Sequence, residues 1–98
     1  MSATQSVKYV LVTGASRGIG RACALRFAEE GWHVFLNCRS SLEELEKVWQ
    51  EIQEQLPGQC TLVPGDVGNP EEVRQIFKKI YQLCPCLDVL VNNAGISH

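Results

Sequence analysis

Short apolar runs alternate with longer amphipathic segments along the chain. Four runs are continuous rather than alternating, and they are rich in β-branched residues: Tyr9–Val12, Val34–Leu36, Thr61–Val63 and Val89–Val91. Continuous apolar runs of this length are typical of strands that are buried on both faces of a parallel sheet. The pattern therefore predicts four strands.

Helical periodicity fills the segments between these runs. A first helix is predicted from about Gly18 to Glu30, followed by Gly31 as a C-cap. Its apolar positions are Ala22, Leu25 and Ala28. The second helix carries an apolar stripe that ends at Pro57-Gly58, and Ser40 with Glu43 predicts a capping box at its start. The stripe consists of Leu42, Leu45, Val48, Trp49, Ile52 and Leu56.

The third helix begins with the strongest signal. Asn69 is a typical N-cap, Pro70 suits the first helical position, and acids follow in the first turn. Its apolar side is Val73, Ile76, Phe77 and Ile80. Strands separated by helices of this length pair in parallel through right-handed crossovers. The fold class is therefore α/β, with a Rossmann-type doubly wound parallel sheet of about four strands and three helices.

A complete sheet of this kind has about six strands. We therefore expect residues 1–98 to be a truncated dinucleotide-binding segment, the N-terminal half of a larger fold without its catalytic half. Such a piece has a marginal core. Its last strand, Val89–Val91, is expected to be an uncovered apolar edge where a second copy or a partner chain can pair.

Composition narrows the class of partners. The 98 residues carry a formal net charge of −2, so no basic field exists for a nucleic-acid backbone or a membrane surface. No apolar run approaches the ~20 residues that span a bilayer. The polar start, residues 1–6, lacks the pattern of a secretory signal, which favours the cytoplasm. Five cysteines include no Cys-x-x-Cys pair, so we expect free thiols and no metal site.

The turn after the first strand contains the residues that indicate a binding function. It reads Thr13-Gly14-Ala15-Ser16-Arg17-Gly18-Ile19-Gly20. A glycine-rich turn between a buried strand and a helix presents free backbone N–H groups and the positive helix end to a pyrophosphate. Gly14 would give a tight exit from the strand, Gly18 would let phosphate approach the backbone, and Gly20 would let the helix lie close to the sheet. The alternative is a loop that needs glycine only to turn.

This turn, together with Asn92-Asn93-Ala94-Gly95 about 75 residues later, resembles the classical short-chain dehydrogenase/reductase family. The similarity is greatest to its 3-oxoacyl-acyl-carrier-protein reductase branch and runs through essentially the whole chain. The resemblance implies that the turn wraps the pyrophosphate and the adenosine ribose of the cofactor. The matching positions are Gly14, Ser16, Arg17, Gly18, Ile19 and Gly20.

The resemblance also bears on the type of cofactor. Members that prefer NAD carry an acid at the end of the second strand, where it binds the ribose hydroxyls. Cys38 occupies that position here, and Arg39 follows it. With no carboxylate to repel a 2′-phosphate, and with Arg17 and Arg39 to pair with it, NADP(H) is preferred over NAD(H). A solvated loop arginine is the alternative interpretation of Arg39.

Two further pairs match the family. Asp66 and Val67 correspond to the pair that holds the adenine, although Asp66 can also be a turn residue or helix cap before Asn69. Asn93, with Ala94 and Gly95 beside it, corresponds to the turn that lies along the cofactor's ribose, whereas Asn92 is expected to brace the sheet. All these loops leave the carboxyl ends of parallel strands, so they converge on one edge.

The family's catalytic residues are not found. Its Tyr-x-x-x-Lys motif is absent, because Tyr9 is followed four residues on by Thr13 and Tyr81 by Pro85. No residue is therefore assigned a catalytic role. The resemblance implies that this chain is the NADP(H)-binding part of an oxidoreductase. That enzyme would reduce a carbonyl by hydride transfer, for example in a 3-oxoacyl thioester of fatty acid metabolism. The alternative is a non-catalytic dinucleotide-binding or sensor module that a partner chain completes.

Overall fold

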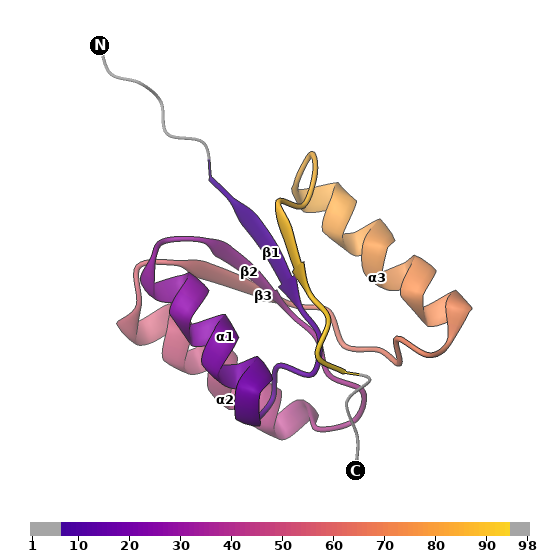
Figure 1. The fold of residues 1–98 in the computed structure, drawn as a ribbon, viewed down its shortest axis with the longest axis horizontal. Coiled ribbons are helices and arrows are strands. Elements are labelled where there is room, and N and C mark those ends of the chain that lie inside the picture. The colour runs from indigo at the N-terminus through magenta and orange to yellow at the C-terminus, as the bar shows by residue number, and fades with distance from the viewer. Residues whose placement is uncertain (1–6, 95–98) are drawn as a thin grey trace.

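The computed structural model describes residues 7–94. Its elements follow the order β1 (Tyr9–Val12), α1 (Gly18–Glu29), β2 (His33–Leu36), α2 (Leu42–Gln55), β3 (Gln59–Leu62), α3 (Pro70–Leu83) and β4 (Val89–Val91). The four strands form one parallel sheet in the order β3-β2-β1-β4. Helices α1 and α2 cover one face and α3 covers the other (Figure 1). The predicted α/β fold class is thereby confirmed.

Each face of the sheet has its own core, which explains why the strands read as continuous apolar runs. On one face, Val10 and Val34 are fully buried among the side chains of α1 and α2. On the other, Leu11 and Phe35 pack against Ile76 and Ile80 of α3. Alternate residues of each strand therefore serve opposite faces. In the part of the chain that the structure describes, no helix is long and apolar enough to cross a membrane.

The buried side of α1 agrees with the predicted one only at Ala28. Gly20, Ala24 and Ala28 face the sheet, while Ala22 is exposed and Leu25 is half-buried. A row of small residues four apart lies on one line of a helix and lets its backbone approach the strands closely. Close approach, rather than the number of apolar side chains, therefore selects this side.

The two predicted helix starts have different outcomes. At α3, the side-chain oxygen of Asn69 accepts hydrogen bonds from the N–H groups of Glu71 (2.9 Å) and Glu72 (3.2 Å), which confirms the cap. At α2 the predicted capping box is wrong. The N-cap is Ser41, and its side chain makes no capping hydrogen bond. The Ser41 hydroxyl instead accepts a hydrogen bond from Arg17 Nη2 at 3.0 Å.

Candidate dinucleotide-binding site

The side chain of Thr13 joins the turns after β1 and β4 at the carboxyl edge of the sheet. Thr13, only 4% exposed, follows β1 directly. Its Oγ1 accepts hydrogen bonds from the backbone N–H groups of Asn93 (2.8 Å) and Ala94 (2.9 Å). The Thr13 backbone N–H donates to the Val91 carbonyl at 3.0 Å. Thr13 therefore holds the turn after β4 against the turn after β1.

Close backbone packing shapes the glycine turn. A Cβ on Gly20 would lie 2.0 Å from the carbonyl oxygen of Gly14 and 2.8 Å from Asn93 Nδ2. Asn93 Nδ2 donates to that same Gly14 oxygen at 3.3 Å. The helix α1, the β1 turn and the β4 turn thus meet at a point that has no room for a side chain at position 20.

The N-terminus of α1 has the properties of an anion site. Gly18 has φ +60°, a left-handed conformation that favours glycine, and nothing lies within 4 Å of where its Cβ would be. The N-cap, Arg17, makes no side-chain capping bond, and the first turn has no acid. The first N–H groups of a helix have no intrahelical partner and carry partial positive charge. Beside them, Ser16 is buried, whereas Ile19 is 71% exposed.

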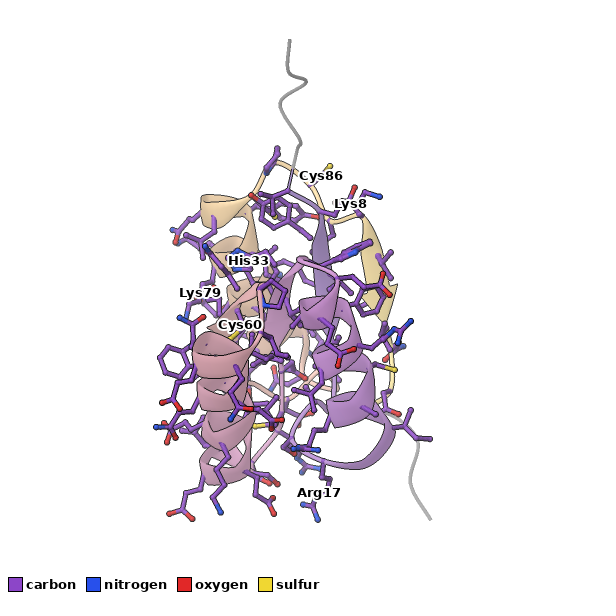
Figure 2. All side chains as sticks on the ribbon, turned by 90° about the vertical axis from the view of Figure 1, so that its left-hand side faces the viewer. Lys8, Arg17, His33, Cys60, Lys79 and Cys86 are labelled. Atoms are coloured by element: carbon purple, nitrogen blue, oxygen red, sulfur yellow. The ribbon has the colours of Figure 1, made fainter. Side chains whose placement is uncertain are left out.

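Arginines stand in the turns after the neighbouring strands β1 and β2. Arg17 lies at one end of the molecule, whereas Lys8 and Cys86 lie at the other (Figure 2). Its Nη2 atom is 3.8 Å from Glu44 Oε1. Arg39, in the turn after β2, has Nε 3.8 Å from Asp66 Oδ2. Both guanidinium side chains are more than 70% exposed, so these long ion pairs are weak.

The end of β2 is the part of the site that sequence reasoning described least well. Cys38 is 3% exposed and belongs to the core beneath α1 and α2. Burial raises the pKa of the Cys38 thiol above its ordinary value, which keeps it neutral. Position 38 therefore faces the core, and Arg39 is the side chain that reaches the solvent edge of the site.

Asn37 holds the turns after β2 and β3 together. It is 1% exposed, and its Nδ2 donates to the carbonyls of Val63 (2.9 Å) and Gly65 (3.1 Å). Its backbone carbonyl accepts from the Ala15 N–H at 2.8 Å, which ties the glycine turn to the same point. A buried amide whose nitrogen donates to two backbone carbonyls makes a rigid support.

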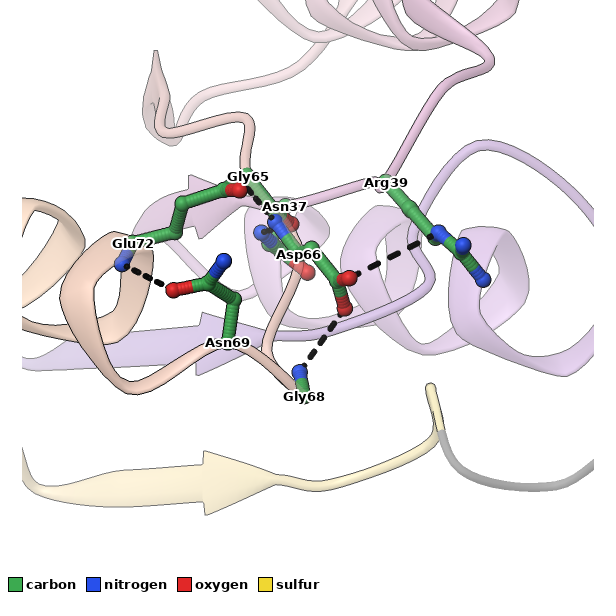
Figure 3. Close-up of polar contacts among 7 residues, drawn as sticks. All are labelled: Asn37, Arg39, Gly65, Asp66, Gly68, Asn69 and Glu72. Carbon is green, nitrogen blue, oxygen red and sulfur yellow. Dashed lines mark hydrogen bonds and ion pairs between the residues drawn. The ribbon is translucent and has the colours of Figure 1, made fainter.

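Asp66 stands between the β3 turn and Arg39 (Figure 3). Its Oδ1 accepts from the Gly68 N–H at 2.8 Å, so it is also the turn residue that the alternative interpretation described. Its own N–H donates to Glu72 Oε1 at 2.8 Å, which anchors the turn to the start of α3. The following residue, Val67, is half-buried.

These turns border a cleft of about 500 Å³ on the α3 side of the sheet. That volume lies within the range of small-molecule sites. Its apolar floor comes from Leu11, Val73, Ile76, Phe77 and Leu90, and its rim from Thr13, Asn37, Arg39, Gly65, Asp66, Val67, Gly68, Asn92 and Ala94. An apolar floor with a polar rim suits a flat ring whose edge carries hydrogen-bonding groups.

The structure thus groups the predicted residues at one edge of the sheet. Arg39, Asp66, Val67 and Ala94 line the cleft, and Gly14 to Gly20 form the turn and helix start beside it. Asn92 lines the cleft, whereas the Asn93 side chain contacts Gly14. Gly95 lies outside the described residues. The contacts of all these residues with a cofactor stay predictions.

Thr13, Asn37 and Glu72 are the supporting residues that sequence reasoning did not identify. For Thr13 and Asn37 a signal was present in the sequence. Each is a polar residue directly after a buried strand, at the position where the next turn must be fixed.

A family profile described as short chain dehydrogenase matches residues 8–98. Together with the parallel sheet and the glycine turn, this match shows that the chain belongs to the short-chain dehydrogenase family.

Individual relatives are oxidoreductases of different specificity. The chain is 44% identical over 90 residues to a 3-oxoacyl-acyl-carrier-protein reductase of Staphylococcus aureus, which covers 92% of this chain and 36% of that protein. It is 43% identical over 88 residues to a glucose 1-dehydrogenase of Gluconobacter oxydans, covering 90% of this chain and 33% of that protein. The chain therefore spans about a third of the length of these relatives.

Solved structures agree with this assignment. L-sorbose reductase from Gluconobacter frateurii, solved with NADPH and L-sorbose, superposes with a TM-score of 0.86 at 34% identity, over 95% of this chain and 35% of that one. An alcohol dehydrogenase from Thermococcus sibiricus, solved with 5-hydroxy-NADP, has a TM-score of 0.81 at 33% identity, over 87% of this chain and 36% of that one.

Proposed function

We propose that this chain is the NADP(H)-binding part of a short-chain oxidoreductase that reduces a carbonyl by hydride transfer. The observation that carries the proposal is an α1 N-terminus without an acidic cap, with Arg17 as its N-cap and Arg39 in the turn after the neighbouring strand β2. Phosphate groups are stabilised at such helix ends and by guanidinium groups.

The charges at the edge favour a 2′-phosphate over free ribose hydroxyls. No carboxylate stands at the end of β2, where Asn37 and Cys38 are buried and Arg39 is exposed. Asp66 and Glu44 each lie 3.8 Å from an arginine, but these exposed pairs are weak and a dianionic phosphate competes well with them. The arginines therefore select NADP(H) over NAD(H).

The remaining residues have roles that fit their positions. The turn with Gly14, Gly18 and Gly20 would hold the pyrophosphate, with Ser16, Arg17 and Ile19 beside it. Asp66 and Val67 would hold the adenine, and Asn93, Ala94 and Gly95 would lie along a ribose. When bound, the cofactor supplies the hydride, and this chain orients it.

The substrate class comes from the relatives. The Staphylococcus aureus relative is named a 3-oxoacyl-acyl-carrier-protein reductase. We assign a 3-oxoacyl thioester to the whole protein, and a cytoplasmic location with it. Within the 98 residues no side chain is assigned to proton transfer. The alternative, a non-catalytic binding or sensor module, would have the same cofactor site. It would not oxidise NADPH even as the whole protein.

Calorimetric titration of NADPH and NADH into the 98-residue chain tests the cofactor assignment. We expect NADPH to bind at least tenfold more tightly. Arg39→Ala removes a charge-assisted hydrogen bond worth about 1.5–3 kcal/mol, so NADPH affinity should fall by roughly 10- to 150-fold while NADH affinity is unchanged. Arg74→Ala is the matched control, because Arg74 is equally exposed but pairs with Glu71 on α3.

Equal affinities for the two cofactors, or equal losses for both in Arg39→Ala, would contradict the assignment. Incubation with NADPH and a 3-oxoacyl thioester tests whether this chain can catalyse the reduction without further residues. We expect no NADPH oxidation by this chain alone, and turnover by the unaided chain would show that catalytic groups lie within it.

A further inference from the structure

The side chain of Glu72 makes a hydrogen bond outside its own helix. Glu72 is the third residue of α3, a position where glutamate usually accepts a hydrogen bond from the N–H of the N-cap residue. Here the N-cap is Asn69, and its N–H already donates to the Asp66 carbonyl at 3.0 Å. Glu72 Oε1 instead accepts from the Asp66 N–H at 2.8 Å, three residues before the cap (Figure 3). This side chain is therefore directed to the turn after β3.

Two hydrogen bonds attach the backbone of Asp66 to the start of α3. The bond from the Asn69 N–H to the Asp66 carbonyl joins main-chain atoms, so it does not depend on a side chain. The bond from the Asp66 N–H depends on Glu72. Holding that N–H restricts rotation about φ of Asp66, and the direction of its carboxylate is restricted with it. Loss of the Glu72 bond would therefore let the carboxylate move.

The Asp66 carboxylate has one oxygen committed to the turn and one with only a weak partner. Its Oδ1 accepts from the Gly68 N–H at 2.8 Å, whereas its Oδ2 lies 3.8 Å from Arg39 Nε in an exposed ion pair. Asp66 and Arg39 line the cleft, and Glu72 is not among the lining residues. Asp66 Oδ2 can therefore accept a hydrogen bond from a ligand, and Glu72 can affect that ligand only through Asp66.

We propose that Glu72 is a positioning residue for adenine recognition: it holds Asp66 where Oδ2 accepts a hydrogen bond from the exocyclic amine of the ring. The inference rests on the proposed function, in which Asp66 and Val67 hold the adenine. A carboxylate acceptor makes a strong, charge-assisted bond, so its placement matters. Hypoxanthine has a carbonyl in place of the amine and would set an oxygen against Oδ2. Glu72 thereby determines how well the site distinguishes the two rings.

Stabilisation of α3 is the other role that an acid at position 72 can have. An acid in the first turn interacts favourably with the helix N-terminus through its charge. Glu71 has that same property, and its carboxylate pairs with Arg74 of α3 at 3.2 Å. The helix role requires negative charge, whereas the positioning role requires a side chain long enough to reach the Asp66 N–H. Charge and length can be changed separately, so the two roles can be told apart.

Calorimetric titration of the chain with NADPH and with its hypoxanthine analogue, reduced nicotinamide hypoxanthine dinucleotide phosphate, tests the inference. We expect the parent to bind NADPH at least about tenfold more tightly than the analogue. Glu72→Asp keeps the charge but is one methylene shorter, so this preference should fall below about threefold. Glu72→Gln keeps the length and an acceptor oxygen, so it should retain most of the preference. Glu71→Asp is the matched control and should behave as the parent does.

The possible failures have different meanings. Absence of saturable NADPH binding by the parent would overturn the proposed function and this inference together. Equal affinity of the parent for the two ligands would leave the dinucleotide site standing and overturn the inference. A preference that survives Glu72→Asp, or that also disappears in Glu71→Asp, would overturn the inference alone. Glu72→Gln decides independently if the shorter acid alters the helical far-UV circular dichroism, because its loss of preference would show that charge matters and reach does not.

Discussion

Replacing Gly20 with alanine tests whether the close approach of α1 to the β1 turn shapes the site. The new Cβ would lie 2.0 Å from the Gly14 carbonyl oxygen, whereas real Cβ atoms stay beyond 3.0 Å of such neighbours. The helix and the turn must therefore separate by about 1 Å. That movement opens the contact where Ala24 and Ala28, both 0% exposed, meet the sheet.

The size of the effect follows from two opposing contributions. Inserting a methyl group into a closely packed site costs up to about 3 kcal/mol. Alanine is a better helix former than glycine by about 1 kcal/mol. We therefore expect Gly20→Ala to lower the free energy of unfolding by about 2 kcal/mol. The NADPH affinity of the folded Gly20→Ala chain should also fall at least tenfold relative to the parent, because the Gly14 carbonyl and its turn move.

Urea denaturation followed by the fluorescence of Trp32 and Trp49, together with NADPH titration at a concentration of urea well below the transition, measures both quantities. Gly31→Ala is the control, since Gly31 lies at the opposite end of α1 with nothing within 4 Å of its Cβ position. It should lose about 1 kcal/mol through its φ of +89° and bind NADPH normally. A Gly20→Ala chain with parental stability and NADPH affinity would refute the reasoning.

Three further predictions concern single polar or thiol groups. Thr13→Val leaves two backbone N–H groups of the β4 turn unpaired and should cost about 1–3 kcal/mol in urea denaturation, whereas Thr13→Ser should stay within about 1 kcal/mol of the parent. Burial lowers the pKa of His33 below 6.5, so the unfolded chain binds the proton more readily. The free energy of unfolding should therefore fall as pH drops below 6.5 and level off below the folded pKa; a His33→Phe chain with the same fall between pH 7 and pH 5 would disprove this. Burial raises the pKa of Cys60 to about 12, so Cys60 should react with Ellman's reagent at pH 8 only after denaturation. The exposed Cys86 should react at once, and loss of that fast phase in Cys86→Ser is the check.

The fold was largely predictable because its determinants are local. The strands at Tyr9–Val12 and Val89–Val91 have the predicted bounds, and the other two differ only at their ends. Burial on both faces leaves a continuous apolar run, which is a strong signal. The buried side of α1 was not predictable in the same way, because Gly20 and Ala24 contribute proximity rather than hydrophobicity.

Helix starts show the same limit. Asn69 and Pro70 act through bonds within four residues, so the α3 cap could be inferred. The hydroxyl at the start of α2 had a competitor 24 residues away, Arg17, and sequence spacing does not show which donor it accepts from.

The candidate site was also predictable only where its determinants are local in the sequence. The glycine turn could be located from its spacing. The bonds that hold it, from Thr13 to the β4 turn and from Asn37 to the β3 turn, join residues that are 26 to 81 positions apart. Such pairings emerge only from the order of the strands in the sheet.

The bonds of Thr13 have a consequence for the timing of synthesis. Thr13 and its partner Ala94 are separated by 81 residues, nearly the whole chain. At ~5–20 residues per second, a ribosome needs roughly 4–16 s to travel that distance. During this interval the glycine turn exists without the β4 turn that Thr13 will hold against it. A ligand of that turn can therefore find both turns in place only after residue 94 has been made, and it then favours the docking of β4 onto β1 rather than the first assembly of β1, α1 and β2.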